Sequence, residues 1–490
     1  MADTSAAKFP LKLLVDKERN RVIFAEADKD FIDVLFSFLT FPMGSIIRLL
    51  GKKSGIGSMD RLYQSVANLD ERCFNTPACQ SMLLHPRSAA EICCKGLAID
   101  VDSDSEPWIY YRCRSSCKSL SLSPIFGARC SCGGTAETPV LASPSLGAEG
   151  SKKGFVVDGV NFIVSDDLLV QPASIGTSLG LINELGVEDG NVLEKKVVHL
   201  GREEILRLMK ISFISKTALT DVFLKKEDTI DYIEKLMVDD IIQSREKRQI
   251  KNESTMKIQM KLFFSNDGDE VVYAEANEEL VNLIFSFLTV PLGSIIKLLN
   301  KNTSLGSIDN LYKSVELLSN HIISDEWKEM LLAPKLAPFF GIDKQLLQIE
   351  EASPYKIQLR VCKTCLSFSY SNRCCSGYNL SSYGWMNPKS LDSGLERGGG
   401  YVKPMGKFMI TDGMDVTFLS PIDSVHIINK LMVPISSLEE VAACLGVAEA
   451  LDLLKACLIS DKVLSGVFSP YIIKLFQMNW LGHFPCKSDA

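Results

Sequence analysis

The sequence predicts an α+β fold in which one unit occurs twice in tandem, and three observations lead to this prediction. Residues 25–66 and 274–315 align without a gap, and 23 of the 42 aligned positions are identical. Segments typical of β-hairpins alternate with segments typical of amphipathic helices in both halves of the chain, which indicates the α+β class. Each half also contains four cysteines at a corresponding place.

The repeat extends well beyond these 42 positions. Residues 162–164 correspond to residues 408–410, and residues 222–223 correspond to residues 467–468. Each copy is therefore a domain-sized unit of roughly 230 residues, far longer than the 20–50 residues of a solenoid repeat. The chain is thus predicted to be a duplication of one globular unit.

Each copy is predicted to contain two small hairpin-plus-helix lobes, joined by a cysteine segment and a mobile loop that is rich in Gly, Ser and Pro. Between the copies lies a charged segment, expected to be a linker or an exposed helix. The predicted organisation is a first repeat at 8–238 (lobe 8–108, cysteine segment 109–134, loop 135–154, lobe 155–238), a linker at 239–258, and a second repeat at 259–475 (lobe 259–354, cysteine segment 355–376, loop 377–400, lobe 401–475).

The amino-terminal lobe is predicted to open with a hairpin and continue with helices. In the second repeat, residues 261–264 and 270–274 flank an Asn-Asp-Gly turn, which is a strong hairpin signal. A helix is expected over 278–288, because Pro291 disfavours helical backbone at the residue before it. Ser307 is expected to be the N-cap of the next helix.

The carboxyl-terminal lobe of the first repeat is predicted to open with a second hairpin. Its strands would be residues 155–157 and 160–164, with Asp158-Gly159 at the turn. Helices are expected to follow at 176–185 and 202–210.

Composition and charge exclude some classes of function. The chain is 46% hydrophobic and 23% charged, with a net charge of −7, as in an ordinary soluble globular protein. A mildly acidic surface disfavours nonspecific binding to nucleic acid. Residues 31–50, the most apolar stretch, are interrupted by Asp33, Pro42 and Arg48, so they are expected to be buried core rather than a membrane span.

The two cysteine clusters are the strongest candidates for a binding site. Fifteen cysteines without a signal peptide favour a reducing compartment, the cytoplasm or nucleus, where thiols serve as metal ligands or core residues. Four thiolates are the ligand set that structural zinc prefers, and four sulfurs leave no open position for a substrate. The spacing is irregular, so degenerate knuckles or small buried hydrophobes remain the alternative. The candidate ligands are Cys113, Cys117, Cys130 and Cys132 in the first repeat and Cys362, Cys365, Cys374 and Cys375 in the second.

No catalytic centre is evident in the sequence. Ser178 lies in a Gly-x-Ser-x-Gly pattern, but no strand leads directly into it, so a polar residue in a helix is the better interpretation. None of the five histidines has a histidine at the equivalent position of the other repeat. Carboxylates are matched between the repeats, namely Glu26 with Glu275 and Asp60 with Asp309, and each is expected to be a surface or capping residue.

Several motifs resemble a known family. They are Phe-Ser-Phe-Leu-Thr-x-Pro-x-Gly-Ser-Ile-Ile at 36–47 and 285–296, Ala-Glu-Ala at 25–27 and 274–276, and the segments 166–170 and 215–224. With these motifs the chain resembles the land-plant family catalogued as domain of unknown function 674, over both repeats. The resemblance implies an intracellular plant protein with a cysteine knuckle between its lobes. The pairs at 130/132 and 374/375 depart from the C-x2-C spacing common there, and the resemblance implies no activity, substrate or catalytic residue.

Three hypotheses about function follow. The first is a protein-interaction or scaffold protein, stabilised by structural zinc, because apolar and turn positions are matched between the repeats whereas polar constellations are not. The second is an enzyme with a pocket between lobes or repeats; a concave pocket lined by Asp, Glu or His would favour it. The third is nucleic-acid binding through the first cysteine cluster and its basic neighbours Arg112, Arg114, Lys118 and Arg129, which the overall charge disfavours.

Overall fold

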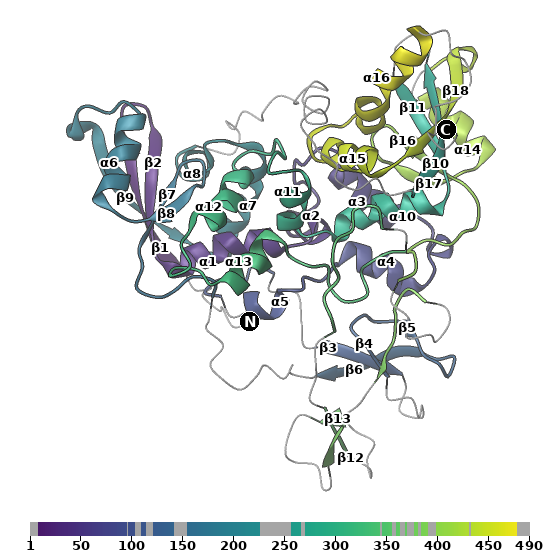
Figure 1. Cartoon of the computed structure of the whole chain (residues 1–490), viewed down its shortest axis with the longest axis horizontal. Helices are drawn as coiled ribbons and strands as arrows, with labels where there is room; N and C mark the ends of the chain where they lie inside the picture. Colours follow the sequence, from purple (N-terminus) through teal and green to yellow (C-terminus); the bar gives the residue numbers. More distant parts are fainter. Residues whose placement is uncertain are drawn as a thin grey trace, which may run out of the picture.

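The computed structural model contains two large five-stranded sheets with a body of helices between them (Figure 1). At one side of that body lie two smaller sheets, one of five short strands and one of three. The chain combines helices and sheets throughout and has the predicted α+β class. The structure describes residues 8–95, 97–102, 109–113, 121–141, 154–225, 256–265, 270–343, 345–354, 359–362, 368–369, 377–380, 384–390, 398–430 and 433–477.

The first sheet combines strands from both ends of the first repeat. Its order is β8-β7-β2-β1-β9, and all neighbouring strands are antiparallel. In β1, Leu11, Leu13 and Val15 alternate with more exposed residues, so one face of the sheet packs on the core. The strands are β1 (Phe9–Asp16), β2 (Arg21–Ala27), β7 (Phe162–Ser165), β8 (Val170–Pro172) and β9 (Leu193–Leu200).

The second sheet has the same organisation in the second repeat. Its order is β17-β16-β11-β10-β18, again with antiparallel neighbours, and each strand takes the place of its counterpart in the first sheet. The hairpin expected from residues 261–274 is formed by β10 and β11. The strands are β10 (Ile258–Ser265), β11 (Val271–Ala276), β16 (Phe408–Thr411), β17 (Val416–Phe418) and β18 (Leu438–Leu445).

The strands predicted for separate lobes thus lie in one sheet, because β2 pairs with β7 and β1 pairs with β9. The predicted hairpin of residues 155–157 and 160–164 is wrong. Val156 instead forms an isolated bridge with Ile323 of the second repeat, and β7 turns back into β8. Neighbouring apolar segments predicted a local pairing here, but long-range partners satisfy these backbone groups.

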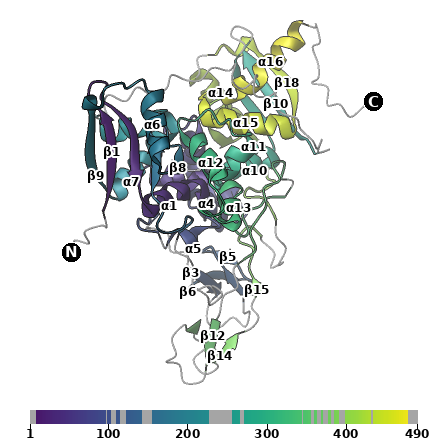
Figure 2. The ribbon, with the colours of Figure 1, turned by 60° about the vertical axis from the view of Figure 1, so that its left-hand side comes forward.

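The helical body between the sheets is built from both repeats and shares one continuous hydrophobic core with them (Figures 1 and 2). Phe36, Phe38 and Leu39 are fully buried, so the apolar stretch 31–50 is core as expected. Its helices are α1 (Lys29–Ser37), η1 (Phe38–Thr40), α2 (Met43–Leu49), α3 (Met59–Asn68), η2 (Glu71–Cys73), α4 (Pro77–Leu84), α5 (Glu91–Cys94), α10 (Glu278–Ser286), η5 (Phe287–Thr289), α11 (Leu292–Leu298), α12 (Ile308–Leu317) and α13 (Asp325–Leu332).

Further helices lie beside the large five-stranded sheet of each repeat. The helices expected at 176–185 and 202–210 are confirmed, the second extending four residues further. No described helix is both long and apolar enough to cross a membrane. The helices are α6 (Ile175–Glu184), η3 (Gly190–Val192), α7 (Arg202–Ile214) and α8 (Ala218–Phe223) beside the first sheet, and α14 (Pro421–Lys430), η6 (Ile435–Ser437), α15 (Val447–Ile459) and α16 (Val463–Gln477) beside the second.

The two repeats meet through equivalent residues at the centre of the helical body. The Met43 N–H donates to the Val290 carbonyl (3.1 Å), and the Leu292 N–H donates to the Phe41 carbonyl (3.0 Å). Met43 and Leu292 are equivalent in the sequence alignment, as are Phe41 and Val290. The contact is therefore approximately two-fold symmetric, like the interface of an isologous dimer.

The helices of each repeat also pack on the sheet of the other repeat. Ser65 of α3 accepts a hydrogen bond from the Val416 N–H (3.0 Å), next to β17 in the second sheet. Ser314 of α12 accepts one from the Val170 N–H (2.8 Å), at β8 in the first sheet. We call this arrangement the reciprocal exchange. It joins residues about 150 to 350 positions apart, a long sequence separation for a contact.

The cysteine segments form the two smaller sheets. The five-stranded cysteine sheet has the order β15-β4-β3-β6-β5, and the three-stranded sheet has the order β13-β12-β14. Their strands are β3 (Ile109–Cys113), β4 (Ser121–Ser123), β5 (Ala128–Arg129), β6 (Thr135–Leu141), β12 (Leu359–Cys362), β13 (Phe368–Ser369), β14 (Gly377–Leu380) and β15 (Gly384–Trp385).

Parts of the predicted mobile loops are ordered strands. Residues 135–141, at the start of the predicted loop 135–154, form β6, which pairs with both β3 and β5. Residues 377–380 and 384–385 of the predicted loop 377–400 form β14 and β15. Their weakly apolar composition suggested a loop, but backbone pairing with neighbouring strands stabilises them. Residues 142–153 lie outside the described residues.

Candidate functional site

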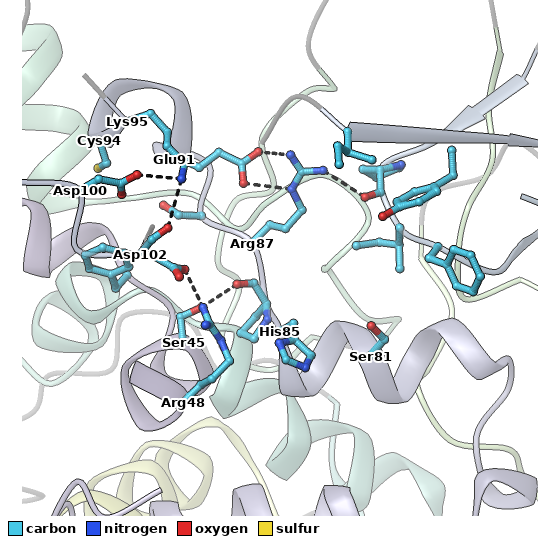
Figure 3. A pocket seen from close by; sticks show the side chains of 18 residues that line it. Ser45, Arg48, Ser81, His85, Arg87, Glu91, Cys94, Lys95, Asp100 and Asp102 are labelled. Atoms are coloured by element: carbon cyan, nitrogen blue, oxygen red, sulfur yellow. Dashed lines mark hydrogen bonds and ion pairs between the residues drawn. The ribbon is translucent and has the colours of Figure 1, made fainter. Parts of the chain in front are cut away.

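A cavity of about 510 Å³ lies between the helical body and the cysteine sheet, within the first repeat. Its volume is in the range typical of small-molecule sites. One wall comes from α2, α4, α5 and the segment that follows α5, and the other comes from β3 and the loop before β5. Figure 3 shows charged side chains converging on it from the first wall.

Three ion pairs line the charged wall. Arg48 of α2 donates to Asp102 (2.6 Å), and Lys95 donates to Asp100 (2.8 Å) and to the Asp102 carbonyl (3.2 Å). Arg87 donates from two nitrogens to both carboxylate oxygens of Glu91, one turn along the chain. The positive and negative charges of these pairs are equal in number. Figure 3 shows Lys95 linking the pair of Arg48 and Asp102 to Asp100, with the pair of Arg87 and Glu91 beside them.

Burial makes this wall electrostatically unusual. Desolvation raises the pKa of Glu91, and the paired Arg87 acts in the opposite direction. The Arg48 Nε is buried and has no hydrogen-bond acceptor among the described residues, although its Nη2 is paired with Asp102. A buried donor without an acceptor is costly, so an acceptor on a bound molecule would be favoured at this point.

His85 lies at the rim of the cavity, where α4 ends. Partial desolvation and the nearby Arg48 lower its pKa, while Asp102 opposes this shift. The imidazole is therefore neutral at pH 7, and a neutral imidazole has one nitrogen able to accept a proton or a hydrogen bond.

The opposite wall is apolar and aromatic. Ile109 and Tyr111 of β3 and Ile125 and Phe126 of the following loop line it. The rings of Tyr111 and Phe126 pack edge to face, with centroids 5.5 Å apart, and Phe126 is 54% exposed. The cavity thus combines a charged wall with a flat apolar one, a lining that suits a small molecule with a polar end and an apolar body.

The charged wall is specific to the first repeat. Tyr63 donates to the Leu84 carbonyl and Tyr312 donates to the Leu332 carbonyl, so these positions correspond. The residue after Leu332 is Ala333, where the first repeat has His85. In the same way, Lys297 takes the place of Arg48. Sequence reasoning missed this site because it looked for polar residues shared by both repeats, whereas Arg48 and His85 differ from their counterparts in the second repeat.

The first cysteine cluster is partly assembled in the cysteine sheet, where β3 ends and where the chain leaves β5. The sulfur atoms of Cys113, Cys130 and Cys132 all lie within 4.8 Å of one another, and the Cys113 and Cys132 sulfurs are 3.4 Å apart. Cys113 and Cys130 are buried, whereas Cys132 is exposed. Three of the four predicted ligands of the first repeat therefore converge, and Cys117 lies outside the described residues.

Strand pairing explains this convergence. Cys113 ends β3 and lies opposite Ala136 of β6, while Ala136 also pairs with Ala128, two residues before Cys130. The turn from Cys130 to Gly134 closes with two 2.9 Å hydrogen bonds, Cys130 N–H to Gly134 carbonyl and Gly133 N–H to Cys130 carbonyl. A Cβ atom on Gly134 would lie 2.9 Å from the Cys113 sulfur, so this position leaves room for the cluster only as glycine.

The second cluster is only partly described. The Cys362 backbone ends β12 and pairs with Gly377 of β14, as Cys113 ends β3. Cys365, Cys374 and Cys375 lie outside the described residues. Elsewhere, Cys444 of β18 is disulfide-bonded.

Other residues singled out in the sequence have structural surroundings. Ser178 lies in α6 with its hydroxyl donating to the Ser174 carbonyl (3.0 Å), so it is not on a strand-to-helix elbow. Asp60 accepts hydrogen bonds from the Ser54 N–H and hydroxyl and Asp309 from the Thr303 N–H and hydroxyl, which fixes the loop before each helix. Glu26 and Glu275 form ion pairs with lysines on neighbouring strands. Of the basic residues near the first cluster, Arg112 and Arg129 are described, and Arg114 and Lys118 lie outside the described residues.

A family model described as "Protein of unknown function (DUF674)" matches residues 5–443 of the chain. The chain belongs to this family. The match covers the cavity, the described cysteine cluster and most of both repeats, so these features belong to a DUF674 protein and not to an added domain. In the searches of curated proteins and of solved structures, nothing matched.

Proposed function

We propose that this protein binds a small organic acid in the cavity of the first repeat. The observation that carries the proposal is the cavity itself, in which a buried charged network faces the apolar surface of Tyr111 and Phe126. The interaction-protein hypothesis drew on the absence of a polar constellation matched between the repeats, whereas this cavity gathers polar groups in the first repeat alone. It favours small-molecule binding over a purely structural role.

The ligand class follows from the donors that the cavity offers. The Glu91 carboxylate is engaged by Arg87, whereas the Arg48 Nε has no described acceptor. A carboxylate near Arg48 would accept from this guanidinium, and hydrogen bonds to a charged partner contribute roughly 1.5–3 kcal/mol each. The rest of the molecule would lie against the aromatic wall. A carboxylic acid with a flat apolar body fits both walls.

His85 gives the same site a means of proton transfer. An imidazole acts as a general base only in its neutral form, and the lowered pKa of His85 favours that form at pH 7. The enzyme hypothesis therefore uses the same cavity, with His85 as its proton acceptor and Arg48 as the group that positions the substrate.

The test is a thermal-shift series with small carboxylic acids, benzoate, cinnamate and hexanoate, and the corresponding amides. We expect an acid with an apolar body to raise the Tm and its amide to have much less effect; at 100 times its Kd an acid adds about 2.7 kcal/mol. Phe126→Ala removes an exposed ring, so it should fold normally and weaken the effect. Equal shifts for acids and amides, or shifts that Phe126→Ala leaves unchanged, would contradict the proposal.

Protein interaction remains a second candidate function, favoured by one observation. Helix α6 has no fully buried residue, and its Ile175 and Leu179 are 81% and 53% exposed. In α14, the corresponding helix of the second repeat, Ile422 and Val425 are 82% and 45% exposed. Large apolar side chains at matched places are typical of interaction surfaces. Neither helix lines the cavity, so the two functions do not exclude each other.

A further inference from the structure

We propose that Cys113, Cys130 and Cys132 bind a zinc ion, and that this ion holds in place the aromatic wall of the cavity. The metal site stands on the geometry of the cysteines alone. Its consequence for the cavity rests on the proposed binding function.

The spacing of the sulfurs suits a metal ion. With Zn–S bonds of about 2.3 Å in a tetrahedron, two sulfur ligands are about 3.8 Å apart. The Cys113 and Cys132 sulfurs are 3.4 Å apart, and all three sulfurs lie within 4.8 Å of one another, which is compatible with that value. A disulfide would instead need two of them at about 2.05 Å. The cluster has the separations expected for sulfurs that share an ion.

The local backbone supports the same assignment. Cys130 and Cys132 lie in the tight turn at 130–134, with one residue between them. Cys113 comes from strand β3. Gly133 has a φ of +84°, a conformation that side chains rarely adopt, and Gly134 leaves space beside the Cys113 sulfur. A turn plus a strand end is how small zinc-binding units bring thiolates together.

The cysteine sheet needs such a crosslink. Among the described residues, the buried cluster around the sulfurs contains Cys113, Ala128, Cys130, Ala136 and Met386, with Tyr111 packed against it. These side chains are small apart from Met386 and Tyr111, so this end of the sheet buries little apolar area, at roughly 25 cal/mol per Å². Small units of this kind are usually stabilised by disulfides or metals.

The metal site and the cavity share two segments of chain. Ile109 and Tyr111 of β3 line the cavity, and β3 ends at Cys113. Phe126 lines it too, and the chain from Phe126 reaches Cys130 through β5. Fixing Cys113 to Cys130 therefore fixes the positions of Tyr111 and Phe126. The ion has no part in binding the acid; it holds the surface on which the acid lies.

The primary test is the metal content of the full chain purified without chelator. We expect zinc to be present, to fall by one equivalent per chain in Cys113→Ser and in Cys130→Ser, and to be unchanged in Cys93→Ser, whose thiol lies in α5 outside the cluster. Cobalt substitution should give a thiolate-to-metal charge-transfer band that both cluster variants lose. Gly134→Ala keeps every ligand but crowds the Cys113 sulfur, so it should weaken zinc in competition with a chelator.

Two results would overturn the metal site: zinc content unaffected by the cluster variants, or a Cys113–Cys132 disulfide found by mass spectrometry in the metal-free native protein.

If a cluster variant fails to fold, chelation of zinc from the unaltered protein replaces it as the test. Chelation should leave the far-UV circular dichroism nearly unchanged and abolish the Tm shift given by the carboxylic acids. Zinc with no acid-dependent shift would refute the binding function alone, whereas acid binding that survives chelation would refute the link between the two.

Discussion

A pair of equivalent aspartates shows how one neighbouring charge alters the same buried site. Asp166 accepts hydrogen bonds from the Thr220 N–H and hydroxyl, and Asp412 accepts the same two from Ser465. In the first repeat Arg21 donates to the carboxylate (3.0 Å). Burial raises the pKa of both aspartates, and the Arg21 guanidinium opposes this for Asp166. For Asp412 the carboxylate of Glu270 raises the pKa further, to about 6.

This difference predicts a pH dependence of stability. The folded-state pKa of Asp412 lies above its ordinary value of 3.8, so the folded chain binds the proton more tightly than the unfolded chain does. The stability that Asp412 contributes is complete below about pH 4 and is lost as the pH rises through about 6. Glu270→Gln removes the acidic neighbour, so it should make this loss smaller, by on the order of 1 kcal/mol at pH 7.

Urea denaturation at pH 4.5 and pH 7 measures this effect, with Glu18→Gln, an exposed turn residue of the first repeat, as the control for charge alone. If Glu270→Gln and Glu18→Gln raise the free energy of unfolding equally at pH 7, Glu270 is not the cause of the pH-dependent loss. The sequence could not predict this site, because Arg21 and Glu270 both appear there as ordinary charged residues at the start of a strand. Each acts on an aspartate that lies more than 140 residues further along the chain.

At the scale of elements, the sequence predicted several helices and strands but not their partners. Ser307 is the N-cap residue of α12 as expected, yet its hydroxyl donates to the Ser215 carbonyl of the first repeat rather than capping its own helix. Ser58 donates in the same way to the Ser460 carbonyl of the second repeat. Local patterns predicted where the helices begin, whereas the reciprocal exchange depends on contacts that no local pattern records.

Gly306 tests the reciprocal exchange directly. Its Cβ would lie 2.5 Å from the Ser212 carbonyl oxygen and 2.8 Å from that of Ser215, both in the first repeat. Gly306→Ala should therefore force the repeats apart and cost about 1–3 kcal/mol beyond the conformational cost of a positive φ. Gly51, with a φ of +65° and open space around it, isolates that conformational cost in Gly51→Ala.

Chemical denaturation of the two glycine variants gives the comparison. Equal losses of stability would mean that the helices of one repeat do not press against the other repeat at Gly306. A larger loss for Gly306→Ala, with an unchanged denaturant slope, would support the exchange, because the slope reports the surface exposed on unfolding.

At the scale of the molecule, the fold is nearly symmetric but its candidate site is not. The large five-stranded sheets of the two repeats have the same strand order, and the contacts between repeats are matched in pairs. The cavity, in contrast, has Arg48 and His85, where the second repeat has Lys297 and Ala333. The sequence predicted the α+β fold because hairpin and helix segments alternate in both halves. It could not predict the site, whose residues are those that differ.

The central claim is that one cavity, in the first repeat, binds a carboxylic acid through Arg48. Isothermal titration of the full chain with the acid that gives the largest Tm shift tests it most directly. The account predicts one site per chain, a loss of affinity of at least tenfold in Arg48→Met, which is about 1.4 kcal/mol, and unchanged affinity in Lys297→Met. Two equivalent sites, or equal losses in Arg48→Met and Lys297→Met, would contradict it.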